Sequence, residues 1–292
     1  MKKFLAILLA AMMIFTVCAC QKTTVDNDQN PDDFQDVNTP DDQTPADDDN
    51  TVTPDDDTNT PDDANTDADD DNTIIMATNA YFKPYEYYEG ENIIGIDAEI
   101  AAAIAEKLGK TLKISDMQFD TILTAVTEGS ADFGMAGMTV TEDRLESVDF
   151  TSSYANGVQS IIVKEGSPIT SVDDLYAEDA AYKIGVQLGT TGDTYSTDDF
   201  GAENVEQYAN ANEAVLALLG DSIDCVIIDN EPAKALVAAN EGLVILETAY
   251  ADEDYAICVA KGNTELLDQL NAAIDELTAD GTIDGILAKY IK

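Results

Sequence analysis

Short apolar segments alternate with amphipathic segments from residue 73 to the end of the chain. Residues 73–77, 112–115 and 132–136 have the length and composition of buried strands, and residues 97–108 and 120–129 have helical periodicity. The alternation continues with strands expected at 183–186 and 224–228 and helices at 213–219, 232–240, 265–277 and 283–290. This alternation predicts an α/β fold with mostly parallel sheets. Such sheets bind ligands at the carboxyl ends of their strands.

The first twenty residues have the features of an export signal. Lys2 and Lys3 precede an apolar run over residues 4–17 that is too short to span a membrane comfortably. Cys20 follows a small alanine, as the lipidated cysteine of a bacterial lipobox does. We therefore predict a signal peptide over residues 1–19 and a lipid anchor on Cys20, with plain secretory cleavage as the alternative.

Residues 20–72 have a strongly biased composition. They contain nineteen Asp and no Glu, with a Thr-Pro-Asp-Asp sequence that occurs three times. Low hydrophobicity and charge of one sign cannot offset the entropy of an ordered chain, so the segment is predicted to be a disordered tether. Because no stretch has the spacing of a calcium-binding loop, we expect only diffuse counterion binding there.

The folded part begins at residue 73 and is long enough for one large domain or two lobes. Of the 59 acidic residues, 19 precede it, which leaves 40 acidic against 11 basic residues. No nucleic-acid partner is expected, because phosphate binding needs a basic surface. Cys225 and Cys258 lie in apolar runs and are interpreted as buried free thiols, with a disulfide as the alternative. Their spacing indicates no metal site, and no cofactor is expected.

Arg144 is the only arginine of the chain, and it follows a predicted strand end. Its planar guanidinium can bind a carboxylate through two parallel hydrogen bonds, which a lysine cannot do. Ala136 and Gly137 carry little side-chain bulk, so a ligand can approach the backbone there, and Thr139 adds a hydroxyl group. We interpret this segment as a site for a small carboxylate. The alternatives are a solvated surface arginine and a tightly packed glycine corner.

Asp229 follows four apolar residues at the end of another predicted strand. A buried carboxylate is costly unless it is paired, so Asp229 is a candidate partner for an ammonium group. Its alternative role is to cap the helix that follows. Residues 189–192, Gly-Thr-Thr-Gly, offer amides at a helix N-terminus to an anion, or form an ordinary connection. Phe82 and Phe119 are candidate pocket walls, although most single aromatic residues are core residues.

Several segments match one known family in their order along the chain. They are residues 77–87, 95–105, 117–120, 136–144, 148–150, 185–192, 224–229, 281–283 and 289–290. Together they resemble the extracellular solute-binding proteins of bacterial polar amino-acid ABC importers. The resemblance covers residues 73–292 and implies a two-lobed clamshell, a type II periplasmic-binding-protein-like fold with two hinge strands. Lobe 1 would comprise residues 73–155 and 256–292, and lobe 2 with the hinge segments residues 156–255.

The resemblance also implies a ligand-binding site. Arg144 and Thr139 would hold the ligand carboxylate, and Gly137, Thr139 and Asp229 its ammonium. Two aromatic residues would pack on the ligand, and two residues of lobe 2 would close over it. The full set of implied ligand-binding residues is Asn79, Phe82, Phe119, Ala136, Gly137, Thr139, Arg144, Gln187, Thr191 and Asp229.

Two departures from the family pattern affect the expected ligand. Asn79 stands where many relatives have Asp or Glu, which removes an obvious partner for a cationic side chain. Gln187 replaces the lysine of some members. Both departures favour a neutral polar amino acid. A third departure, Ala98 in place of a larger aliphatic residue, concerns packing only.

The expected function follows from the resemblance and from the candidate residues. We expect a monomeric binding protein that captures a free amino acid and delivers it to an ABC permease and its ATPase. Its lipid would be its only contact with the membrane and would hold it at the outer face of the bacterial cytoplasmic membrane. The alternatives are a sensor without an importer and, less favoured, a lyase or dehydratase on the same fold. The chain contains no His, so catalysis would have to rest on carboxylates, Lys or Tyr.

Overall fold

The computed structural model describes residues 72–178 and 180–291. The expected signal peptide, the lipidated Cys20 and the acidic tether lie outside the described residues, which begin at the last residue of that tether. No helix within the described ranges is both long and apolar enough to cross a membrane.

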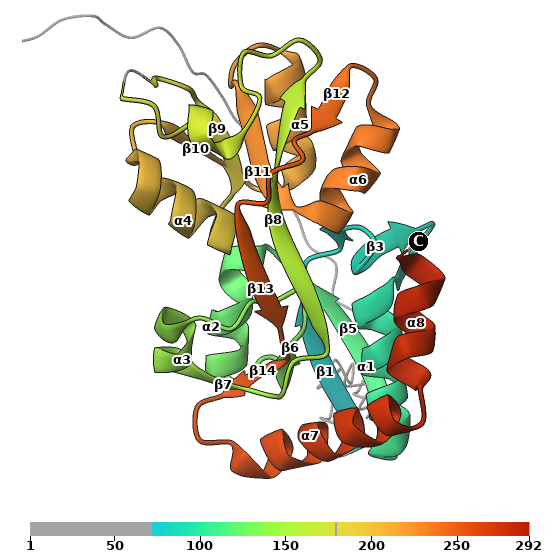
Figure 1. The fold of residues 1–292 in the computed structure, drawn as a ribbon. Coiled ribbons are helices and arrows are strands. Elements are labelled where there is room, and N and C mark those ends of the chain that lie inside the picture. Colours follow the sequence, from blue (N-terminus) through green and yellow to red (C-terminus); the bar gives the residue numbers. More distant parts are fainter. Residues whose placement is uncertain (1–71, 179, 292) are drawn as a thin grey trace, which may run out of the picture. The chain divides into compact units, whose positions relative to one another are not determined.

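The first sheet joins the two ends of the described chain (Figure 1). Its strands, in spatial order, are β5 (Thr111–Asp116), β1 (Thr73–Thr78), β6 (Phe133–Gly134), β14 (Cys258–Ala260) and β7 (Val148–Phe150). β1 pairs in parallel with β5 and β6, whereas β14 pairs antiparallel with β6 and β7. A small separate sheet consists of β2 (Tyr81–Phe82), β3 (Glu86–Glu89) and β4 (Asn92–Ile94). The chain thus leaves this half of the fold after β7 and returns to it at β14.

The second sheet is built from the central part of the chain. Its strands, in spatial order, are β10 (Val205–Tyr208), β9 (Ile184–Gln187), β11 (Cys225–Asp229), β8 (Ala155–Lys164) and β12 (Leu243–Ile245), and β13 (Ala251–Tyr255) also pairs with β8. β9 pairs in parallel with β10 and β11, whereas β8 pairs antiparallel with β11, β12 and β13. The sequence predicted mostly parallel sheets. Parallel pairing is confined to three strands of each sheet, because β14 in the first sheet and β8 in the second run opposite to every strand with which they pair.

β8 and β13 connect the two halves of the fold. Ala155–Gln159 of β8 pairs antiparallel with β13, and Figure 1 shows the two strands running side by side between the sheets. An isolated bridge between Thr139 and Tyr255 ties the end of β13 to the first half. The fold is therefore α/β with two lobes joined by two hinge strands, which confirms the expected fold class.

Helices cover both sheets. Those of the first half are α1 (Ile96–Lys107), η1 (Phe119–Thr121), α2 (Ile122–Thr127), α3 (Glu142–Ser147), α7 (Thr264–Ala279) and α8 (Thr282–Tyr290). Those of the second half are η2 (Val172–Asp174), α4 (Thr191–Phe200), α5 (Ala211–Leu219) and α6 (Asn230–Ala239). Ile100 and Ile104, one turn apart on α1, are fully buried in a core that also contains Leu270 and Ile274 of α7. The helical spacing of apolar residues thus places one stripe of each helix in the core.

Asp97 begins the helix predicted over residues 97–108, where an Asp is typical of an N-cap. In the structure Asp97 does not cap α1. The N-cap is Gly95, whose φ of 132° and close approach to the backbone of Tyr85 leave no space for a side chain. Asp97 lies in the first turn, fully buried, and its Oδ2 accepts hydrogen bonds from the Gly137 amide and the Tyr154 hydroxyl, both at 2.8 Å. Its carboxylate therefore fixes the backbone after β6 and does not cap the helix.

Candidate ligand-binding site

The structure brings all ten predicted site residues together around one small cavity. They come from strand ends and the loops after them in both halves of the fold, as the strand-end argument predicted. Two further residues, Glu86 and Thr190, also line the cavity. Its lining residues are Asn79, Phe82, Glu86, Phe119, Ala136, Gly137, Thr139, Arg144, Gln187, Thr190, Thr191 and Asp229.

Arg144 lies in the first turn of α3, where its backbone amide donates to the hydroxyl of the N-cap residue Thr141. Its side chain is only 9% exposed. Nη1 donates to the Thr139 carbonyl at 2.7 Å, and Nη2 donates to the Gly189 carbonyl of the other lobe at 3.2 Å. The Phe119 ring lies 5.5 Å from the guanidinium carbon. No acidic side chain of the described residues forms an ion pair with Arg144, so the site holds a buried cation in need of an anion.

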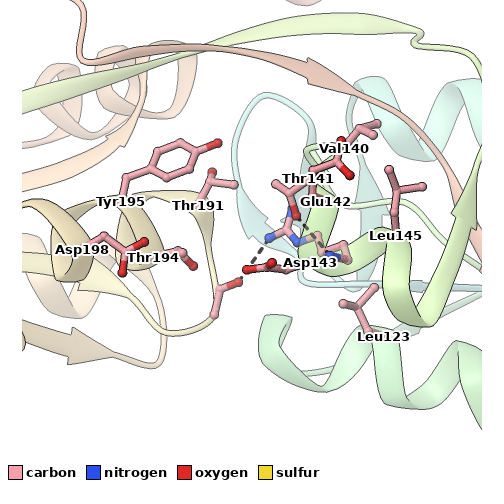
Figure 2. Close-up of a pocket in the computed structure, with 12 residues that line it drawn as sticks. Leu123, Val140, Thr141, Glu142, Asp143, Leu145, Thr191, Thr194, Tyr195 and Asp198 are labelled. Atoms are coloured by element: carbon pink, nitrogen blue, oxygen red, sulfur yellow. Dashed lines mark hydrogen bonds between the residues drawn. The ribbon is translucent and has the colours of Figure 1, made fainter.

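An open groove lies next to the enclosed cavity and shares Arg144 and Thr191 with it. Figure 2 shows Tyr195 and Asp198 of α4 on one side of this groove and Glu142 and Asp143 of α3 on the other. Burial lowers the pKa of the Arg144 guanidinium, but arginine remains charged in proteins. The only arginine therefore lies between a closed cavity and a groove open to solvent.

Asp229 is the last residue of β11 and is 7% exposed. The Tyr255 hydroxyl donates to its Oδ1, and Gln159 Nε2 donates to its Oδ2 at 2.9 Å. Its side chain makes no capping hydrogen bond to α6, so the alternative role as a helix cap is not supported. Burial raises the pKa of Asp229 well above its ordinary value, and the charge of Glu253 raises it further. No cation of the described chain pairs with this carboxylate.

The backbone at Gly137 forms part of the cavity wall. Its amide donates to Asp97, so the donors that remain for a carboxylate nearby are Arg144 and the Thr139 hydroxyl. Gly137 has a φ of 54°, and a β-carbon there would lie 2.7 Å from Cε1 of Phe82. The Phe82 ring in turn stacks on Tyr85 with ring centroids 5.6 Å apart. Glycine is thus required both by the backbone conformation and by the aromatic wall.

Replacing Gly137 by alanine is expected to destabilise the protein and to weaken ligand binding. The positive φ costs about 1–2 kcal/mol for any other residue, and the new methyl group displaces the Phe82 ring. Gly129→Ala is the matched control, because Gly129 also has a positive φ but nothing lies within 4 Å of its added carbon. Thermal unfolding should show a loss in both variants, and the ligand titration a loss only in Gly137→Ala. Equal affinities in the two variants would contradict the role of this wall.

Asn79 and Gln187 connect the two lobes at the cavity. Gln187 Nε2 donates to Asn79 Oδ1 at 2.9 Å, and Asn79 Nδ2 donates to the Met117 carbonyl at 2.7 Å. A β-carbon at Gly189 would lie 2.9 Å from Cβ of Asp120, which belongs to the other lobe. These contacts, with the bond from Arg144 to Gly189, show the lobes in a closed arrangement.

The sequence pattern missed several buried polar residues at the site. Glu86 is fully buried, and neither of its carboxyl oxygens has a hydrogen-bond donor among the described residues. Burial and the Asp97 charge raise the pKa of Glu86 well above its ordinary value, which favours the neutral form of this carboxyl group. Glu253 and Tyr255 were missed on β13, although their two-residue spacing places both on the buried face of a strand. Gln159 on β8 was also missed.

Within the described ranges, no group of three or more His, Cys, Asp or Glu side chains could hold a metal ion. Cys225 and Cys258 are both buried and free, as expected. Burial raises the pKa of the Cys258 thiol to about 12. The chemistry that the cavity offers is therefore hydrogen bonding and charge pairing by Arg144, Asp229 and their neighbours.

Two α/β lobes that close on a small polar cavity beneath two hinge strands define a type II periplasmic binding protein, a class that holds a solute between its lobes. Residues 74–292 match the bacterial extracellular solute-binding proteins, family 3, and the chain belongs to that family. Relatives in this family are amino-acid-binding proteins of ABC transporters.

Individual relatives have names or bound ligands that identify what they bind. The arginine-binding extracellular protein ArtP of Bacillus subtilis is 31% identical over 222 residues, which is 74% of this chain and 85% of that protein. An ancestral arginine-binding protein bound to glutamine is 37% identical with a TM-score of 0.71, over 75% of this chain and 98% of that one. Its structure bound to arginine gives 37% identity and a TM-score of 0.70, over 76% of this chain and 99% of that one.

Proposed function

We propose that this protein captures a free amino acid outside the cytoplasmic membrane and delivers it to the permease and ATPase of an ABC importer. One observation carries the proposal. A buried cation, Arg144, and a buried carboxyl group, Asp229, line the same cavity, and neither has an ionic partner in the described residues. An α-amino acid supplies both missing charges on one carbon, because its carboxylate and its ammonium are joined there.

The lining residues have distinct roles in this proposal. Arg144 and the Thr139 hydroxyl bind the carboxylate, and Asp229 binds the ammonium together with Gly137 and Thr139. Phe82 and Phe119 pack on the ligand. Ala136 leaves space for it, and Thr191 closes over it from the second lobe. A ligand that contacts both lobes favours the closed form, which the transporter would recognise.

The side-chain end of the cavity favours a neutral polar amino acid in our proposal. Asn79 and Gln187 supply amide groups there, which can both donate and accept hydrogen bonds to an uncharged polar group. The only further carboxyl group on the lining, Glu86, is neutral because of its raised pKa. Among the relatives, one ancestral arginine-binding protein was solved with glutamine bound and one with arginine bound, so both a neutral and a cationic amino acid are found in this family.

The proposal extends to the parts of the chain outside the described residues. Residues 1–19 would be removed as a signal peptide, a lipid on Cys20 would anchor the protein, and residues 20–72 would be a tether. The protein would then act as a monomer at the outer face of the cytoplasmic membrane. We further propose that lobe 1 comprises residues 73–155 and 256–292 and lobe 2 residues 156–255, and that the protein has no catalytic activity.

A thermal-shift screen of the purified protein against the twenty amino acids and cystine tests the function. A ligand raises the unfolding temperature by an amount that grows with the logarithm of its concentration over its Kd. We expect neutral polar amino acids to stabilise the protein most. No stabilisation by any amino acid would refute the proposed function, and stabilisation by Lys and Arg alone would refute the neutral preference.

The same screen on Asn79→Asp is expected to shift the response toward Lys and Arg.

A further inference from the structure

Two buried carboxyl groups bind the same side-chain amide next to the cavity. Gln159 Nε2 donates to Asp229 Oδ2 at 2.9 Å and to Glu253 Oε2 at 3.0 Å. The three residues lie on β8, β11 and β13, so both hinge strands contribute. Gln159 is 1% exposed, Asp229 7% and Glu253 6%. Because one nitrogen contacts both acids, their oxygens are separated by at most twice a hydrogen-bond length.

No cation among the described residues forms an ion pair with either acid. Both acids act electrostatically on Arg144 without forming an ion pair with it. Glu253 Oε1 is buried without a hydrogen-bond partner. The titratable groups that face the pair from the surrounding elements are Tyr85 from the loop after β2, Glu86 of β3, Arg144 of α3, Tyr195 of α4 and Tyr255 of β13.

Two carboxylates this close cannot both be ionised in a buried site. Burial is the main cause that raises the pKa of Asp229, and the charge of Glu253 is the next. The ligand-free protein therefore keeps a proton on Asp229, beside Glu253 and at the end of the cavity where the ligand ammonium would bind.

We propose that the ammonium of the ligand enters in exchange for the proton that Asp229 holds beside Glu253, so that each binding event releases one proton. The inference rests on the proposed function, because it assigns the cation end of the same site. On binding, Asp229 loses this proton to solvent. The ionised Asp229 then pairs with the ammonium. Glu253 is a positioning residue that acts through Asp229, since it does not line the cavity.

The exchange fixes the sign of the pH dependence. The complex holds one proton fewer than the free protein, so the association constant rises with pH. The rise is at most about tenfold per pH unit for one proton, and it ends where Asp229 is already ionised in the free protein. Above that point the ligand displaces no proton and its affinity no longer depends on this pair.

Calorimetric titration of the full chain tests the exchange. The probe is the amino acid that stabilises the protein most in the screen, titrated at each pH in two buffers that both work at that pH and whose ionisation enthalpies differ, acetate and MES at the acid end and phosphate and Tris at the neutral end. The series runs from about pH 5 to pH 8. At its acid end, we expect the two apparent binding enthalpies to differ by the difference between the ionisation enthalpies of the two buffers, because one proton is released. Tight binding with equal enthalpies in both buffers throughout that series would overturn the inference and leave the proposed function intact. An absence of amino-acid binding would instead refute both.

Glu253→Gln is the variant that isolates the second acid. It removes the charge that holds the proton on Asp229 and adds an amide that donates to an ionised Asp229. We expect the proton release to disappear while the amino acid still binds. Asp252→Asn is the matched control, since it makes the same charge change on an exposed neighbour in β13 and should release one proton like the parent protein. Proton release that persists in Glu253→Gln would overturn the role of Glu253. If that variant does not fold, the two-buffer titration of the parent protein decides alone.

Discussion

Replacing Arg144 by alanine is expected to weaken amino-acid binding by at least a hundredfold. Arg144 is buried at the cavity, and its guanidinium has no acidic partner in the described residues, so the ligand carboxylate is its only counter-charge. Removing one partner of a buried charge pair costs about 3–5 kcal/mol. Each 1.4 kcal/mol is roughly a factor of ten in Kd. Calorimetric titration with the ligand found in the screen measures the loss.

Two further variants separate charge from geometry in this experiment. Arg144→Lys keeps the charge but loses the planar fork, so an intermediate loss is expected. Lys113→Ala makes the same charge change as Arg144→Ala on the exposed surface of β5 and should bind like the parent protein. The unfolding temperature of each ligand-free variant shows that it is folded. An unchanged Kd in folded Arg144→Ala would contradict the assignment of the carboxylate.

The sequence allowed the charged ends of the site to be predicted because of their position along the chain. Arg144 and Asp229 each lie at or just beyond the end of an apolar strand, and parallel strands of α/β sheets bring such ends to one edge. Gly137 could be identified because a strand end of small residues leaves the backbone accessible. These arguments use local composition and one rule of topology, and all three residues line the cavity.

The polar residues behind the cavity could not be predicted in the same way. Gln159 contacts Asp229 across 70 residues of sequence and Glu253 across 94. Those contacts depend on the register of β8 against β11 and against β13, which is set by tertiary packing and not by local pattern. In the sequence, Glu253 lies in an acidic run that is typical of an exposed strand.

Asp97 shows how a correct local pattern can give a wrong role. An Asp at the start of a helix is typical of a cap, since its side chain can accept from the first amides. Here the backbone of Gly95 makes the turn, and Asp97 instead binds Gly137, forty residues further on. Only the tertiary contacts of Asp97 with Gly137 and Tyr154 decide between the two roles, and the contact with Gly137 also holds the cavity wall in place.

Replacing Asp229 by asparagine is expected to have opposite effects on binding and on stability. Binding should weaken at least a hundredfold, because the ammonium loses the only ionisable group that lines its end of the cavity and can pair with it, a loss of about 3–5 kcal/mol. The ligand-free protein should become more stable. Asparagine has the same shape, carries no charge to bury, and its oxygen still accepts from Tyr255. Its amide takes the place of the oxygen that accepts from Gln159, and the loss of that bond offsets part of the gain.

The stability gain has a pH dependence that distinguishes it from a general effect of packing. Because the pKa of Asp229 is raised in the folded protein, its contribution to stability is full below the unfolded value of about 4 and is lost as pH rises through the folded value. The gain in stability of Asp229→Asn over the parent protein should therefore be absent in acid and grow with pH. Each kcal/mol of this gain raises the unfolding temperature by about 2–4 °C. Ligand-free unfolding curves of both proteins across that range provide the measurement. A constant difference at every pH would mean that Asp229 is not a strained anion, and the ammonium would then need another partner.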